Sequence, residues 1–161
     1  MDYLAFIQGK IVRNRKELTN ILNQWRFKNE KIVFTNGCFD ILHRGHVEYL
    51  AKAASLGNKL LIGLNTDASV RRLKGENRPV NDQEARALLL SSLIFTDKII
   101  FFEEDTPYEL IRFIEPDVLV KGSDYKPENI VGYDILKNKG GEVITIDLTG
   151  GFSTTSILKK I

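Results

Sequence analysis

The chain is poor in several residue types whose patterns define whole classes of protein. It has one cysteine, Cys38, in 161 residues, which excludes an internal disulfide and suits a reducing cytoplasm. Its formal net charge is only +2, too small to indicate a nucleic-acid partner by itself. No apolar stretch reaches the roughly 20 residues that cross a bilayer, and the first residues lack the pattern of a secretory signal. We therefore expect a cytoplasmic protein that neither inserts into a membrane nor binds nucleic acid.

Breaks between domains are also missing. The four prolines are scattered, no Gly/Ser-rich linker divides the chain and no segment repeats. Hydrophobic residues make up 43% and charged residues 27%, the balance of an ordinary globular protein. We predict a single domain over residues 1–161, with a leading helical segment at 1–29 and a core at 30–161.

Short apolar runs alternate with helical patterns along this core. The runs are continuous rather than alternating, as expected for strands covered on both faces. Strands are predicted at 31–35, 59–64, 98–102, 117–121 and 142–147, and helices at about 44–56, 67–73, 82–94, 107–114 and 129–139. Leu18, Ile21, Leu22 and Trp25 form one face of an earlier helix. The alternation predicts an α/β fold, a doubly wound, open parallel sheet of five strands of the Rossmann-like type.

Small, polar and charged residues follow most of the predicted strands. Sheets of this kind bind ligands beyond the carboxyl ends of their strands, so these residues are expected to meet at one site. They are Thr35, Asn36, Gly37, Asn65, Asp67, Lys121, Gly122, Asp124, Ser153, Thr154 and Thr155.

Both histidines of the chain fall in one motif, H-R-G-H at 43–46. Three residues apart at the start of a predicted helix, His43 and His46 point the same way. Gly45 lets an anion approach the backbone, and the helix N-terminus favours phosphate. The same dipole disfavours a charged imidazole. Two neutral donors could therefore stabilise the charge that builds on a phosphoryl group during transfer.

Other interpretations fit these residues when they are considered in isolation. The histidines can be ordinary polar residues at a helix start, or they can form a metal-binding triad with Asp40. The basic residues Arg71 and Lys74 can be a solvated face, or a cationic arm over bound phosphates. Arg78 and Arg86 are further phosphate candidates.

A longer pattern surrounds the histidines. GCFDILHRGH at 37–46 resembles the GxFDxxHxGH signature of the cytidylyltransferase-like nucleotidyltransferases. NTDASVRRLKG at 65–75, RPVN at 78–81, FEEDTP at 102–107, LVKGSDYKPE at 119–128 and STT at 153–155 resemble the adenylyltransferases of ADP-heptose synthesis. Ser123 departs from that likeness, since those enzymes more often have a second glycine there. Many of them are fused to a sugar kinase, for which 161 residues leave no room, so a stand-alone form is expected.

The resemblance implies direct transfer of AMP from ATP to D-glycero-β-D-manno-heptose 1-phosphate, which gives ADP-heptose and pyrophosphate for the lipopolysaccharide inner core. Mg²⁺ would enter with ATP, held chiefly by the nucleotide and water rather than by dedicated side chains. The implied catalytic residues are His43, His46 and Lys74. The implied nucleotide-binding residues are Thr35, Asn36, Gly37, Phe39, Asp40, Gly45, Lys121, Gly122, Asp124, Ser153, Thr154 and Thr155. The implied substrate-binding residues are Asn65, Asp67, Arg71 and Arg78.

Several alternatives stay open within this resemblance. Asp40 is implied to order either its loop or a histidine. The sequence does not show whether the nucleotide is ATP or CTP, or which sugar is used. A glycerol-3-phosphate cytidylyltransferase is therefore a rival within the class. A non-catalytic nucleotide-binding module is a rival from another class. The resemblance also implies a homodimer, and a separate heptose kinase as the upstream partner.

Overall fold

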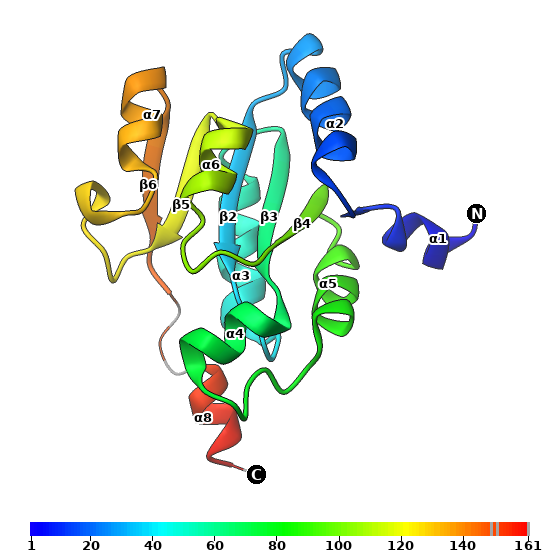
Figure 1. Ribbon diagram of the computed structural model, residues 1–161, viewed down its shortest axis with the longest axis vertical. Helices are drawn as coiled ribbons and strands as arrows, with labels where there is room; N and C mark the ends of the chain where they lie inside the picture. The colour runs from blue at the N-terminus through cyan, green and yellow to red at the C-terminus, as the bar shows by residue number, and fades with distance from the viewer. Residues whose placement is uncertain (149, 151, 161) are drawn as a thin grey trace.

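The structure is a computed structural model that describes residues 1–148, 150 and 152–160. The strands are β1 (Ile11–Val12), β2 (Ile32–Gly37), β3 (Lys59–Asn65), β4 (Lys98–Phe102), β5 (Val118–Gly122) and β6 (Glu142–Ile146). The helices are α1 (Tyr3–Gln8), α2 (Arg15–Phe27), α3 (Arg44–Ala54), α4 (Asp67–Lys74), α5 (Gln83–Ser91), α6 (Tyr108–Ile114), the 3₁₀ helix η1 (Pro127–Asn129), α7 (Tyr133–Lys139) and α8 (Thr154–Leu158). Figure 1 shows α4 and α8 at the end of the sheet toward which the strands point.

The strands of the described chain form one parallel sheet in the order β1-β4-β3-β2-β5-β6. This confirms the predicted doubly wound parallel sheet and corrects its size from five strands to six. The added strand, β1, places Ile11 opposite Ile99 and Val12 opposite Ile100 of β4. Two residues are too few to carry a hydrophobic period, so β1 is defined by the open edge of β4 and not by its own sequence.

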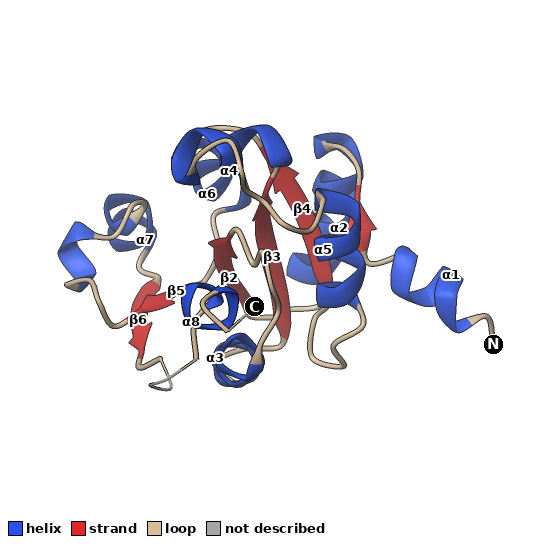
Figure 2. Ribbon diagram, turned by 90° about the horizontal axis from the view of Figure 1, so that it is seen from below, coloured by secondary structure: helices blue, strands red, loops and turns tan. Residues whose placement is uncertain are grey.

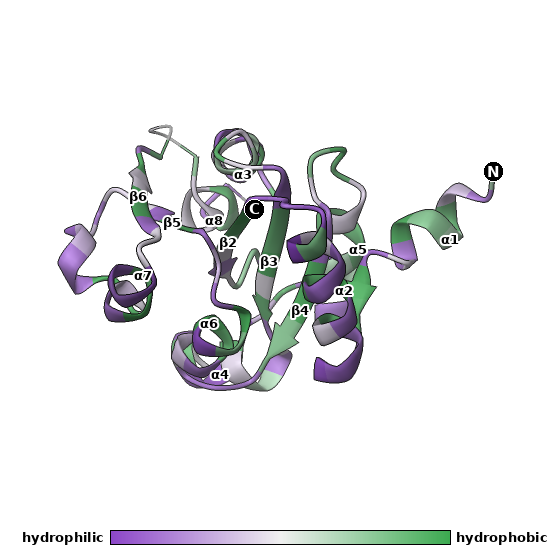
Figure 3. Cartoon of the chain, turned by 90° about the horizontal axis from the view of Figure 1, so that it is seen from above, coloured by the Kyte–Doolittle hydropathy of each residue, from purple (hydrophilic) through white to green (hydrophobic). Residues whose placement is uncertain are grey.

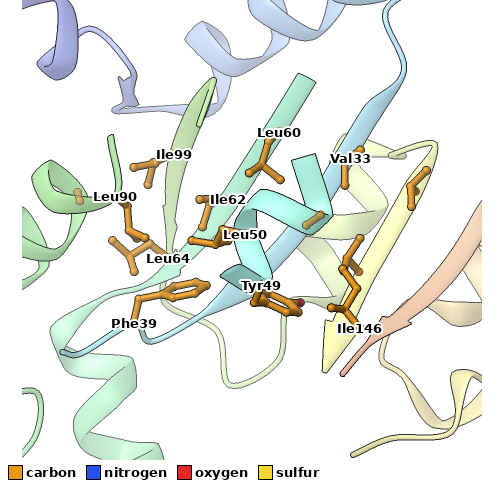
Figure 4. Packing of buried hydrophobic residues seen from close by; sticks show 14 of the residues in the cluster. Val33, Phe39, Tyr49, Leu50, Leu60, Ile62, Leu64, Leu90, Ile99 and Ile146 are labelled. Carbon is orange, nitrogen blue, oxygen red and sulfur yellow. The ribbon is translucent and has the colours of Figure 1, made fainter. Parts of the chain in front are cut away.

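Helices cover both faces of the sheet, as Figure 2 shows from below. On one face, Tyr49 and Leu50 of α3 and Leu90 of α5 belong to a single buried cluster with Ile62 of β3 and Ile99 of β4 (Figure 4). Their burial follows from the continuous apolar runs, because a strand with apolar residues at every position has two faces to cover.

The opposite face is covered by α2, α6 and α7. Leu22 and Trp25 of α2, Ile111 of α6 and Leu136 of α7 are buried in a second cluster that includes Phe34 of β2. The predicted apolar face of the earlier helix therefore closes the core. The predicted helix 129–139 begins later, as α7, because Gly132 has a φ of 93°. A Cβ at Gly132 would lie 2.8 Å from Ile111 Cδ1.

Helix α1 projects from the body of the molecule (Figures 1 and 3). None of its six residues is buried, and Tyr3, Leu4 and Phe6 are exposed. Within the described ranges, no helix combines the length and the apolar composition that a membrane crossing requires.

Candidate functional site

The strand order reverses at β2, which has β3 on one side and β5 on the other. Val33 and Phe34 are the residues of β2 that pair with β5, so regular pairing ends before Thr35. The Thr35 hydroxyl bridges the two strands there, since it donates to the Val120 carbonyl at 3.0 Å and lies 2.8 Å from the Tyr49 hydroxyl. A crevice at such a reversal is where open α/β sheets bind ligands.

Two adjoining cavities occupy this crevice. The first, of about 230 Å³, is lined by the ends of β2 and β5, and the second, of about 260 Å³, by the start of α3 and the start of α8. Both are lined by His46, Lys74, Arg78, Leu148 and Thr154. They are therefore two halves of one cleft, here called the first and second cavity.

Most of the residues predicted for the site line this cleft. The first cavity is lined by Asn36, Gly37, Phe39, Asp40, Lys121, Gly122 and Asp124, and the second by His43, Gly45, Ser153 and Thr155, in addition to the shared residues. Thr35, Asn65, Asp67 and Arg71 line neither cavity. Thr35 and Asn65 are buried, and Arg71 is exposed on α4.

The histidine rings form a stacked pair at the wall of the cleft. The His43 and His46 ring centroids are 3.7 Å apart at an interplanar angle of 23°. Phe39, with a φ of 44°, sets its ring edgewise to His46 at 5.2 Å. In the described part of the chain, neither Nδ1 atom has a hydrogen-bond partner, although both are buried.

Burial also sets the charge of these rings. It lowers the pKa of His43, and together with the neighbouring His43 it lowers the pKa of His46 to about 4. Both imidazoles are therefore mainly neutral at pH 7, as the motif predicts. Desolvation is the main cause of the lowered pKa of each ring.

Gly45 makes the stacked pair possible. A Cβ at this position would lie 3.1 Å from two atoms of the His43 ring and 3.3 Å from Phe152 Cβ. His43 is the N-cap of α3 but makes no capping hydrogen bond with its side chain. The ring is therefore available to the cleft, and no described side chain caps the first amides of α3.

Asp40 orders a neighbouring segment rather than a histidine. Its carboxylate accepts hydrogen bonds from Arg78 Nε at 2.6 Å, the Val80 amide at 2.8 Å and the Asn81 amide at 3.1 Å. Burial opposes ionisation, but these donors outweigh it and hold the pKa of Asp40 below its usual value. Arg78 is thereby fixed at the wall that both cavities share.

These contacts argue against the metal-binding alternative. The Asp40 carboxylate is committed to Arg78 and the two amides, so it does not complete a triad with the histidines. Among the described residues, no three His, Cys, Asp or Glu side chains are grouped closely enough to hold a metal ion.

Arg86 has a structural role that the sequence patterns missed. Arg86 is 1% exposed. Its guanidinium donates hydrogen bonds to the carbonyls of Asn81, Cys38 and Asn65 at 2.7–3.0 Å and to the Asp67 carboxylate at 2.8 Å. It joins the loop after β2 to the end of β3, the start of α4 and the segment before α5. All these partners are protein groups, so Arg86 is not placed as a phosphate ligand.

Two lysines supply uncommitted positive charge to the cleft. Lys74 lines both cavities and Lys121 lines the first. Within the part of the chain that the structure describes, neither ammonium makes an ion pair or hydrogen bond. Burial lowers the pKa of Lys121. Together with Arg78 and the two imidazoles, they form a donor set suited to a polyphosphate.

A cationic cleft at the switch point of a parallel sheet, with paired imidazoles at a helix start, defines a nucleotidyltransferase. The family model described as "Cytidylyltransferase-like" matches residues 34–157, and the chain belongs to that family. This matches the family that the GxFDxxHxGH signature indicates.

Two similar proteins share the name "Bifunctional protein HldE". "Bifunctional protein HldE" of Wolinella succinogenes is 57% identical over 150 residues, which are 93% of this chain and 31% of that protein. The protein of the same name from Syntrophotalea carbinolica is 51% identical over 161 residues, 100% of this chain and 33% of that protein. The chain thus spans about a third of the length of the curated relatives it matches.

Solved structures share the fold. A lipopolysaccharide core biosynthesis protein from Thermoplasma volcanium is 25% identical with a TM-score of 0.60, and the match covers 74% of this chain and 97% of that one. Pantoate-beta-alanine ligase from Francisella tularensis has a TM-score of 0.61 at 16% identity, covering 94% of this chain and 72% of that one. The second likeness concerns the fold alone.

Proposed function

We propose that the chain transfers AMP from ATP to D-glycero-β-D-manno-heptose 1-phosphate, giving ADP-heptose and pyrophosphate for the lipopolysaccharide inner core. The family and the likeness to the HldE proteins support this assignment. The observation that carries it is the stacked pair of His43 and His46 on the wall of a cleft whose two lysines make no ion pair with any described residue. Binding alone does not require two converging imidazoles, whereas phosphoryl transfer gains from them.

The reaction proceeds by direct displacement. A phosphate oxygen of the sugar 1-phosphate attacks the α-phosphorus of ATP in line. The bond between the α-phosphorus and the oxygen that bridges it to the β-phosphorus breaks. The electron pair leaves with pyrophosphate. The attacking oxygen is already anionic, so no general base and no covalent enzyme intermediate are needed.

The protein contributes mainly position and charge. In this proposal the β- and γ-phosphates bind at the start of α3, and the departing pyrophosphate lies in the second cavity. His46, Lys74 and Arg78 line both cavities, so the α-phosphorus reacts beside them. Asp124, which lines the first cavity, is placed to accept hydrogen bonds from ribose hydroxyls.

Magnesium fits this cleft as an ion carried by the nucleotide. The carboxylates lining the first cavity are those of Asp40, which is committed to Arg78, and Asp124, which is exposed. Phosphate oxygens and water supply the octahedral oxygen ligands that Mg²⁺ prefers. When bound, the ion would neutralise part of the triphosphate charge, while the chain supplies the donors on the remaining oxygens.

Pyrophosphate release tests this function. The protein is assayed with ATP, CTP, GTP and UTP against heptose 1-phosphate, hexose 1-phosphates and glycerol 3-phosphate. We expect the highest kcat/KM for ATP with heptose 1-phosphate. Preference for CTP with glycerol 3-phosphate would support the rival cytidylyltransferase, and the absence of turnover with every pair would contradict both.

Three further expectations accompany this function. We propose that a separate heptose kinase acts upstream and supplies the phosphate of the sugar 1-phosphate. We place the protein in the cytoplasm, where ATP is available and the unpaired thiol of Cys38 stays reduced. We also propose a homodimer, supported by the exposed apolar side chains of Tyr3, Leu4 and Phe6 on α1; light scattering should give twice the chain mass, and a monomer mass would contradict it.

A further inference from the structure

A third cavity adjoins the cleft on the side away from the histidines. It measures about 130 Å³ and is lined by Pro107, Lys121, Tyr125, Asn129, Ile130 and Val131. Lys121 and Tyr125 also line the first cavity, whereas no described residue lines both the second and the third. The three cavities therefore follow one another in a row, with the first in the middle.

Lys121 stands at the boundary between the first and third cavities. It is the fourth residue of β5, and its ammonium has neither an ion pair nor a hydrogen bond within the described chain. Lys121 is partly buried, and a partly buried ammonium without an ion-pair partner is unfavourable. Its position therefore suits an anionic group that sits at this boundary when substrates are bound.

The far wall of the third cavity combines polar and apolar groups. Asn129 and Tyr125 offer an amide and a hydroxyl, while Pro107, Ile130 and Val131 are apolar. A sugar ring presents hydroxyls around its rim and C–H groups on its faces, and this mixture matches such a wall. A charged phosphate would find a partner only at Lys121.

The direction of the displacement decides which substrate lies on this side. In-line attack requires the incoming oxygen and the leaving pyrophosphate to lie on opposite sides of the α-phosphorus. With pyrophosphate against the start of α3 in the second cavity, the attacking phosphate must arrive from the side of Lys121. The acceptor's sugar then continues beyond Lys121.

We propose that the third cavity is the binding site for the sugar of the acceptor, with its 1-phosphate held at Lys121. This inference rests on the proposed nucleotidyl transfer and adds to it the residues that select the acceptor. Asn129 and Tyr125 hydrogen-bond the sugar hydroxyls, and Val131 limits the size of the sugar. The nucleoside of ATP stays in the first cavity.

The test fills the cavity without touching the histidine cleft. Val131→Phe places a larger side chain in the third cavity, and Leu88→Phe is its control, since both residues are 37% exposed and Leu88 lines none of the three cavities. In the pyrophosphate assay, we expect Val131→Phe to raise the KM for heptose 1-phosphate at least tenfold and to leave the KM for ATP unchanged. Leu88→Phe should change neither value.

Asn129→Ala is a second variant, at an exposed position, in case the phenylalanine disturbs folding. It should raise the acceptor KM severalfold at an unchanged ATP KM. A raised ATP KM with an unchanged acceptor KM in either variant would place the nucleoside in the third cavity and overturn the inference, as would no effect of both variants on either KM.

Failure of the proposed function gives a different result. If the wild-type chain uses another phosphorylated acceptor, the heptose assignment fails, and the same variants are measured with the acceptor that is used. A raised KM for that acceptor would still support the third cavity as the acceptor site, and an unchanged KM would overturn it.

Discussion

Substitution of Asp40 by asparagine should separate the charge of this side chain from its shape. The Asp40 side chain is 2% exposed and receives three hydrogen bonds, from Arg78 and from the amides of Val80 and Asn81. An asparagine oxygen can still accept from the two amides. Its NH₂ group, however, would face the N–H of Arg78, so the ion pair is lost and two donors oppose each other.

The expected loss of stability is about 2–4 kcal/mol. A hydrogen bond to a charged group contributes roughly 1.5–3 kcal/mol, and removal of one partner from a buried ion pair costs about 3–5 kcal/mol. The Arg78 side chain is 19% exposed, so water partly compensates it and the lower part of that range applies. Pyrophosphate release should fall at least tenfold, because Arg78 is no longer held at the wall of the cleft.

The pH dependence gives this prediction a distinct signature. The pKa of Asp40 is lowered in the folded state, so its contribution is complete above the unfolded pKa of about 3.9 and is lost as the pH falls through the lower, folded value. The difference in unfolding free energy between wild type and Asp40→Asn should be full at pH 7 and shrink below about pH 4.

Urea denaturation at pH 7 and at pH 3.5 measures both effects. The control is Asp82→Asn, the same chemical change at the exposed N-cap of α5, where asparagine caps equally well and the change should stay within about 0.5 kcal/mol. If Asp40→Asn is as mild as the control at pH 7, or if its effect does not decrease in acid, the assigned role of the ion pair is wrong.

Three further predictions concern the histidine pair. His46→Ala should abolish pyrophosphate release while nucleotide affinity falls much less, because Lys74 and the start of α3 remain; normal turnover would contradict the catalytic role. ATP should raise the pKa of His46 from about 4, since bound phosphate favours the charged ring. Calorimetry in two buffers of different ionisation enthalpy should then show proton uptake on ATP binding near pH 5 and none near pH 8, and equal heats near pH 5 would be evidence against it. Gly45→Ala should keep the unfolding free energy within about 1 kcal/mol, because helix propensity offsets crowding, yet lower turnover at least tenfold as the His43 ring is displaced; unchanged turnover would show that the stacking is dispensable.

The sequence predicts the central strands well and the margins of the fold poorly. Buried strands such as β3 can be predicted because their residues form unbroken apolar runs. Ile11–Val12 has no such signal, because its strand character comes from the edge of β4. The start of α7 depends on the backbone of Gly132, which has a positive φ. Ile111 packs against Gly132 and leaves no room for a side chain there. In both cases the deciding partner is distant in the sequence.

The candidate site is likewise predictable from the sequence only in part. The contiguous motif at 37–46 places His43, Gly45 and His46 together because neighbours along the chain stay neighbours in space. The sequence does not show which charges satisfy one another. Asp67, predicted to contact substrate, accepts a hydrogen bond from the buried Arg86. A lone arginine within the apolar run A-R-A-L-L-L at 85–90 is the one local sign that Arg86 is buried and bonded.

The reach of Arg86 has a consequence for how this fold can diversify. One guanidinium fixes the loop after β2, the junction of β3 with α4 and the segment before α5, so an insertion in any of them would disturb the others. The third cavity is built from residues 107–131, none of which Arg86 holds. Grafts that retarget the enzyme to a new acceptor should therefore succeed when they exchange 129–131 alone, whereas segments held by Arg86 must be exchanged as a set.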